Sequence, residues 1–286
     1  MRHPVARRSR YWSLFHRPWV LSAASILALL VIVALLGPLF MQDPFTQSLE
    51  NRLKPPAFAG GDTSHLLGTD QLGRDVLSRL VQGARVSLMV GVIAVAVSGV
   101  LGVLLGLFAG FYRGLADEVI MRIVDLRLAL PFILLVIAII AVFGPSLTNL
   151  ILVLALTGWA GYARVVRAEV LSVREREFVL AARSMGASDW RLMTRHILPN
   201  TVSAAVVIAS LELAQMVITE SALSFLGLGI QPPVPSWGNM LGEGREYLLT
   251  SWWLATFPGV AIAMTAVSIN IVGDWLRDVL NSRVRL

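Results

Sequence analysis

Two acidic residues, Glu212 and Glu220, interrupt an otherwise apolar run between residues 201 and 225. In a helix their side chains lie about 80° apart around the axis and ~12 Å apart along it, so both could face one protein interior. An acid near the centre of a membrane-spanning helix costs ~2.5–3.5 kcal/mol. One of them could line a transport pathway and meet a cationic or amino group of a cargo. Pairing with an arginine or at a subunit contact is the alternative.

Other side chains offer little chemistry. The chain has no cysteine, and its lysine, Lys54, follows Asn51-Arg52-Leu53 rather than glycines, which excludes a Walker A phosphate loop. The four histidines show no HExxH spacing, and none lies in an apolar run. Asp125, beside Arg122 and Arg127, is interpreted as a local charge cluster rather than a proton relay. We therefore expect no catalytic residue, no metal site and no cofactor bound by this chain.

The composition is that of a membrane protein. Of 286 residues, 56% are hydrophobic and 15% charged, with a mean hydropathy of +0.72, against roughly 25% charged residues in soluble domains. Runs of about 20 apolar residues can cross ~30 Å of hydrocarbon as helices. Gly144-Pro145 divides the longest run, and Pro258-Gly259 is expected to kink the last. We predict an all-α membrane protein with six transmembrane helices at about residues 19–40, 86–112, 118–143, 147–168, 201–225 and 248–272.

The basic residues predict the orientation. Cytoplasmic flanks of membrane helices carry the excess of arginine and lysine. If the N-terminus is inside, the inner segments carry 18 basic residues and the outer segments 6. Both termini are therefore expected to be cytoplasmic, and the net charge of +6 reflects topology rather than nucleic-acid binding.

The inner segment from residue 164 to 200 is longer than a connection requires and reads as helix, break, helix. Gly186 suits a helix C-terminus, Ser188 can cap the next helix, and Pro199 is expected to end that helix before the fifth span. Small Ala181 and Ala182 leave room for another surface to approach. A solvated amphipathic hairpin that merely links two spans is the alternative.

The outer segment, residues 42–85, is also long. Asp70 can cap a helix that begins near Gln71, and the i,i+4 pairs Asp70/Arg74 and Asp75/Arg79 favour a surface helix there. The segment could also form part of an outer docking face, and both interpretations can hold.

The inner segment resembles a known family. Ala181-Ala182-x3-Gly186 followed by Leu198-Pro199 is similar to the EAA loop of inner-membrane permease subunits of ABC importers, E-A-A-x3-G-x9-I-x-L-P. Leu180 and His196 stand where that pattern has Glu and Ile. Further stretches resemble the dipeptide, oligopeptide and nickel importer permeases, in particular the C-type permease of the peptide systems: residues 65–79, 83–88, 224–233, 235–238 and 273–278.

This resemblance implies a type-1 ABC importer permease fold and a role for the loop as a coupling helix that sits in a groove of an ATP-binding subunit. Gly186 would then set the turn, and Ala181 and Ala182 the close approach. Candidates for polar contacts are Arg183, Asp189 and Arg191. The outer segment with Asp70, Arg74, Asp75 and Arg79 would contribute to the face on which a binding protein docks.

The resemblance also implies the partners: a second, homologous permease, two ATP-binding subunits that hold ATP and Mg, and an extracytoplasmic substrate-binding protein, assembled at the inner membrane. Dipeptides or short oligopeptides are the expected cargo, translocated by alternating access, with nickel or glutathione as alternatives. A proton-coupled secondary transporter that uses Glu212, Glu220 or Asp125 is a rival mechanism, and an intramembrane enzyme is a weaker one.

The expected organisation has three parts. Residues 1–85 would hold a cytoplasmic tail, the first span and the periplasmic loop. Residues 86–274 would form the permease domain, with its coupling loop at 170–200, and residues 275–286 a cytoplasmic tail.

Overall fold

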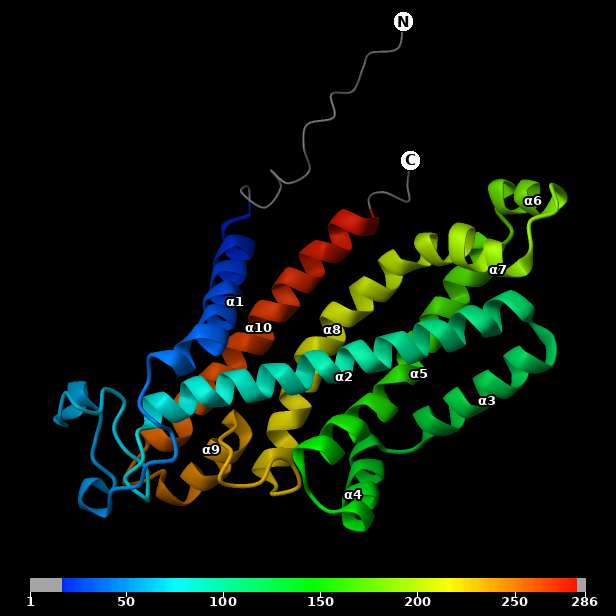
Figure 1. Cartoon of the computed structure of the whole chain (residues 1–286). Coiled ribbons are helices and arrows are strands. Elements are labelled where there is room, and N and C mark those ends of the chain that lie inside the picture. The colour runs from blue at the N-terminus through cyan, green and yellow to red at the C-terminus, as the bar shows by residue number, and fades with distance from the viewer. Residues whose placement is uncertain (1–16, 282–286) are drawn as a thin grey trace, which may run out of the picture.

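The computed structural model describes residues 17–281, which are helical except for connecting segments and one isolated β-bridge (Figure 1). The expected N-terminal tail and the last five residues of the C-terminal tail lie outside the described residues. The principal helices are α1 (Pro18–Leu36), α2 (Val76–Tyr112), α3 (Gly114–Ala129), α4 (Phe132–Phe143), α5 (Leu147–Val173), α6 (Glu177–Ser184), α7 (Asp189–Arg191), α8 (Leu198–Phe225), α9 (Trp237–Gly244) and α10 (Trp253–Asn281).

Side-chain caps explain where two of the long helices begin. The Asp75 carboxylate accepts the backbone N–H of Ser78 at 2.8 Å and starts α2, and the Ser146 hydroxyl accepts that of Asn149 at 3.1 Å and starts α5. Helix α2 therefore begins ten residues before the span expected at residue 86. Its 37 residues make about 55 Å of helix, well beyond the ~30 Å of hydrocarbon.

The expected third span is broken. Helices α3 and α4 meet at 91° across Leu130 and Pro131. A proline disfavours helical backbone in the residue before it, and Leu130 is extended with φ −80° and ψ 130°. Among the described residues, five helices are long and apolar enough to cross a membrane, or six if α3 and α4 together make one span.

Pro199 does not end a helix, and the expectation that it would is wrong. Helical structure is continuous from Asp189 to Phe225. The six residues directly before α8, Leu192–Ile197, form a π-helix. A locally widened turn of this kind can satisfy the backbone groups that a proline frees within a long helix.

Helix α2 packs along α5 through glycines. Gly102, Gly106 and Gly110 are spaced four residues apart on one face of α2, and a Cβ on any of them would overlap atoms of α5 between Trp159 and Val170. Small residues at this spacing let two helix backbones approach closely, as is common in membrane proteins.

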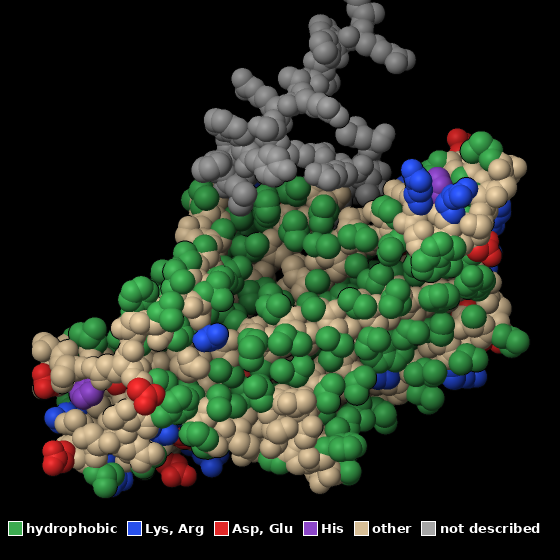
Figure 2. All heavy atoms as spheres, in the orientation of Figure 1, with side chains coloured by type: hydrophobic (Ala, Val, Ile, Leu, Met, Phe, Trp, Pro, Cys, Tyr) green, Lys and Arg blue, Asp and Glu red, His purple; other side chains and the backbone are tan. Residues whose placement is uncertain are grey.

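The elements separate into two ends (Figure 1). The start of α1, the end of α10 and the α6–α7 region lie toward one end, whereas α9 and the segment before α2 lie toward the other. Arg17, just before α1, pairs with Asp278 of α10 at 3.0 Å. Helix α10 runs through residues 275–281, which were expected as tail. Figure 2 shows hydrophobic side chains over the middle of this face and most charged ones at the two ends.

Candidate functional site

The segment between α5 and α8, residues 174–197, is built around a turn at Gly186. Gly186 has φ +81°, its N–H bonds the Arg183 carbonyl at 3.0 Å, and the N–H of Ala187 bonds the Ala182 carbonyl at 3.1 Å. This is the Schellman arrangement that ends a helix, and it favours glycine at the left-handed position. Apart from its chain neighbours, no atom of the described residues lies within 4 Å of the place a Cβ would take, so the requirement for glycine is conformational. The prediction that Gly186 ends a helix is confirmed.

This segment is fastened to the end of α2. Arg174 donates from Nη1 to the carbonyl oxygens of Gly110, at 3.2 Å, and Phe111. The Arg183 guanidinium lies 5.7 Å from the centre of the Phe111 ring. Buried Val179 and Ala182 of α6 pack in the same cluster as Phe111. Helix α6 is therefore packed directly against the end of α2.

The solvent-exposed surface of the segment between α5 and α8 carries apolar and basic side chains. Phe178, Leu180, Met185 and Trp190 are 42%, 43%, 82% and 69% exposed. Exposed apolar side chains gathered on a short segment are typical of a protein interface. The exposed arginines of the same segment are Arg176, Arg183, Arg191 and Arg195.

The predicted coupling residues divide between this face and the interior. Ala181 is exposed, but Ala182 is buried in the chain's own core, so the room it leaves serves α6 packing. Ser188 precedes α7 but makes no side-chain capping bond, which contradicts its expected role. Asp189, Arg191 and Pro199 are exposed and Leu198 is half-buried.

At the other end, Asp70 does not cap a helix near Gln71, and no surface helix forms there. The helix begins at Val76, after Gly73 turns the chain with φ +70°. Asp70 is 1% exposed, and its Oδ1 accepts the backbone N–H groups of Leu72 and Arg74 at 2.8 and 2.9 Å. Asp70 is instead part of a buried ion network, which the spacing of residues in the sequence does not reveal.

That network joins the outer segment to α9. Asp70 Oδ2 accepts hydrogen bonds from Arg74, at 2.6 Å, and from Arg79. Both arginines also donate to Glu243 of α9, at 3.1 and 2.9 Å. Asp75, expected to pair with Arg79, instead lies 3.1 Å from His65. Glu243 was not predicted, because it lies 164 residues from Arg79 in the chain.

The surroundings of the Glu243 carboxyl favour its charged form. Burial raises the pKa of the Glu243 carboxyl, but Arg79, Gln71 and Arg74 more than offset that effect, and its pKa lies below the usual value. Glu243 is therefore a carboxylate at neutral pH, and it joins α9 to the outer segment through charge-assisted hydrogen bonds.

The two acids of α8 have different surroundings. Glu220 is fully buried, accepts from Ser224 at 2.8 Å and lies 3.4 Å from the Ser221 hydroxyl. Glu212 is half-buried and lines a cavity of about 290 Å³ between α3, α4, α5 and α8. The cavity is lined by Arg127, Leu128, Phe132, Thr157, Gly158, Gly161, Glu212, Gln215, Met216 and Thr219.

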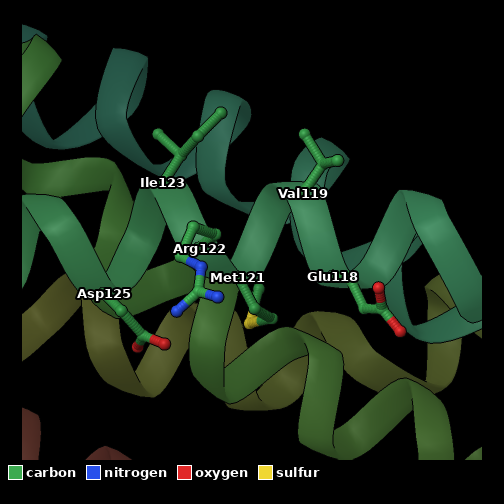
Figure 3. Close-up of a pocket in the computed structure, with 6 residues that line it drawn as sticks. All are labelled: Glu118, Val119, Met121, Arg122, Ile123 and Asp125. Carbon is green, nitrogen blue, oxygen red and sulfur yellow. The ribbon is translucent and has the colours of Figure 1, made fainter.

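Helix α3 carries a second, shallower hollow of about 500 Å³. Figure 3 shows Glu118, Met121, Arg122 and Asp125 on one side of α3, with Val119 and Ile123 on the opposite side. Asp125 pairs with Arg164 of α5 at 2.6 Å. The ion-pair partner of Asp125 therefore comes from another helix rather than from the neighbouring Arg122 or Arg127.

Comparison with known proteins identifies relatives over almost the whole chain. Residues 102–286 match the family described as binding-protein-dependent transport system inner membrane component. The chain is 41% identical to the di/tripeptide transport system permease protein DppC of Pseudomonas aeruginosa, over 96% of this chain and 92% of that protein. It is also 41% identical to the glutathione transport system permease protein GsiD of Pectobacterium atrosepticum, over 96% and 91%.

Solved structures show the same fold at lower identity. An inward-facing MetNI methionine ABC transporter chain aligns with a TM-score of 0.57 and 19% identity, over 71% of this chain and 97% of that one. A chain of an amino acid ABC transporter with histidines aligns with a TM-score of 0.52 and 17% identity, over 73% and 94%.

Proposed function

This chain belongs to the family of binding-protein-dependent transport system inner membrane components, and we propose that it is the permease subunit of an ATP-binding-cassette importer for dipeptides or short oligopeptides. The observation that carries this proposal is the α5–α8 segment. It presents an exposed apolar and basic face, turned by Gly186 and fastened to α2 through Phe111. A partner subunit that binds this face and moves would displace the membrane helices with it.

ATP chemistry belongs to partners in this proposal. The chain has no lysine in a Walker A context, so ATP and Mg would be held by two ATP-binding subunits beneath the α5–α8 segment. A second, homologous permease would complete the translocation pathway. A binding protein would deliver cargo to the outer end, where the segment with Asp70, Arg74, Asp75 and Arg79 joins α9.

The proposed function also implies an orientation of the chain in the membrane. We place both termini and the α5–α8 segment in the cytoplasm of a multi-pass inner-membrane protein, with α3 and α4 counted together as one of six spans. The excess of basic residues at that end supports this orientation. Because the chain lacks cysteine, labelling of single introduced cysteines by a membrane-impermeant maleimide reads the orientation without background.

The cargo assignment rests on the relatives, whose names specify di/tripeptides, D,D-dipeptides and glutathione. All three are peptides with free termini, so peptides are the common cargo chemistry. Nickel remains the alternative cargo for the same architecture.

The energy source provides the test of function. Cells that carry or lack this chain are given radiolabelled dialanine, and uptake is measured after ATP depletion by arsenate and, separately, after a protonophore. We expect chain-dependent uptake that stops when ATP is depleted and continues when only the proton gradient is lost. Uptake that stops with the proton gradient while ATP is unchanged would favour a secondary transporter instead.

A further inference from the structure

The cavity beside Glu212 holds two opposite charges that do not neutralise each other directly. Glu212 lies on α8 and Arg127 near the end of α3, and both line the cavity. They interact electrostatically, yet among the described residues neither makes an ion pair within 4.0 Å. The Arg127 Nε atom is buried and has no hydrogen-bond partner in this part of the chain. Both charged groups therefore line the cavity without an ion-pair partner among the described residues.

Other buried acids in the described chain are satisfied. Asp70 and Glu243 are held by two arginines, and Glu220 is held by serines. Against this background Glu212 and Arg127 stand out, because charged groups inside a membrane protein normally find partners or line a pathway. The Arg127 guanidinium also lies 5.7 Å from the centre of the Phe132 ring, which holds it at the cavity wall.

The wall contributed by α8 is a polar stripe. Glu212, Gln215 and Thr219 follow at i, i+3 and i+7 and thus share one face of the helix, and all three line the cavity. Gly161 of α5 also lines the cavity, near Glu212. A Cβ added to Gly161 would lie 3.7 Å from Glu212 Oε1, so the glycine has no side chain that covers this oxygen. The stripe places one carboxylate and two neutral polar side chains along the cavity wall.

We propose that this cavity is a cargo subsite for the termini of a dipeptide, in which Glu212 takes the ammonium group and Arg127 the carboxylate. This inference rests on the proposed function and deepens it. Extended peptide advances ~3.3–3.6 Å per residue, so the two charged ends of a dipeptide lie roughly 7 Å apart. Such a zwitterion offers one opposite charge to each of two groups that line the same cavity and do not pair with each other. The volume of about 290 Å³ is near the lower end of small-molecule pockets, ~300–1,000 Å³.

The proposal is tested with dipeptides in which one charged terminus at a time is blocked. The purified complex of permease and ATP-binding subunits, without its binding protein, is examined by equilibrium dialysis with radiolabelled dialanine, N-acetyl-dialanine and dialanine amide. Wild type should bind dialanine about ten-fold or more tightly than either blocked form, because each blocked form loses one charge-assisted contact. Glu212→Gln should remove the preference over the N-acetyl form alone, and Arg127→Gln the preference over the amide alone.

Asp125→Asn is the matched control, because Asp125 lies on α3 outside the cavity and should change neither preference. A variant that weakens all three ligands equally would show a merely structural role and overturn the subsite, as would wild-type protein without preference or without binding. ATP-driven import of dialanine through the binding protein is measured in parallel. If import persists while the preference is absent, only the subsite fails; if wild type imports no dialanine, the proposed function fails.

Discussion

Replacing Gly186 by valine should lower cargo uptake by the assembled importer about five- to thirty-fold while ATP hydrolysis continues. Gly186 has φ +81°, and a side chain there costs ~1–2 kcal/mol, more for a β-branched residue. The added side chain would meet open space, so the strain comes from the backbone conformation and is relieved by changing the turn. Helix α6 is then displaced from its packing against Phe111. As a result, closure of the ATP-binding subunits no longer moves α2. Uptake and hydrolysis are measured together in proteoliposomes.

Gly227 provides a closely matched control. It follows the end of α8, at the other end of the molecule, with φ +78°. It has the same pair of backbone bonds, from its own N–H to the Ser224 carbonyl and from the N–H of Leu228 to the Leu223 carbonyl. Gly227→Val should impose similar strain without disturbing the ratio of uptake to hydrolysis. Gly186→Asn, which tolerates the left-handed conformation, should retain most uptake. Normal uptake by Gly186→Val would contradict the role of this turn.

Replacing Asp70 by asparagine should loosen the outer segment by about 3–5 kcal/mol, because it leaves the Arg74 and Arg79 guanidinium groups partly unneutralised in a buried site. The amide is nearly isosteric, and its oxygen can keep the backbone bonds from Leu72 and Arg74. Its NH2 group then stands where Oδ2 accepts from the two arginines, so the change removes both the charge and these hydrogen bonds. Limited proteolysis of residues 42–75 and thermal unfolding of the purified protein measure the effect.

The control for this variant is Asp62→Asn in the same outer segment, where the carboxylate accepts the backbone N–H of Ser64 and lies at the surface. It should leave proteolysis and unfolding unchanged. If Asp70→Asn is as stable as Asp62→Asn, the buried network does not hold the outer segment to α9.

Local signals in the sequence sufficed for much of the fold. The apolar runs predict most of the helices, and the Gly186 turn depends on one residue whose backbone preference is strong. Ser188 and Pro199 show the limit of such rules. Ser188 precedes a helix without capping it, and the π-helix before Pro199 lets the chain remain helical.

The contacts of the Glu243 network and of the Glu212 cavity could not be predicted in this way. Glu243 meets Arg79 across 164 residues, so no spacing rule identifies the pair. Arg127 was assigned to a cluster with Asp125, but it faces Glu212 because the bend at Pro131 carries the end of α3 beside α8. The pre-proline rule could have indicated that bend. Its consequence for Arg127 depends on tertiary packing.

We propose that this chain moves cargo with ATP energy supplied by other subunits. An affinity tag on its C-terminus, gentle extraction from the native membrane and identification of the stoichiometric partners test it most directly. We expect a second permease together with ATP-binding subunits, and ATP hydrolysis that is absent from the chain purified alone. Recovery of a lone homo-oligomer that transports on a proton gradient without ATP would contradict this mechanism.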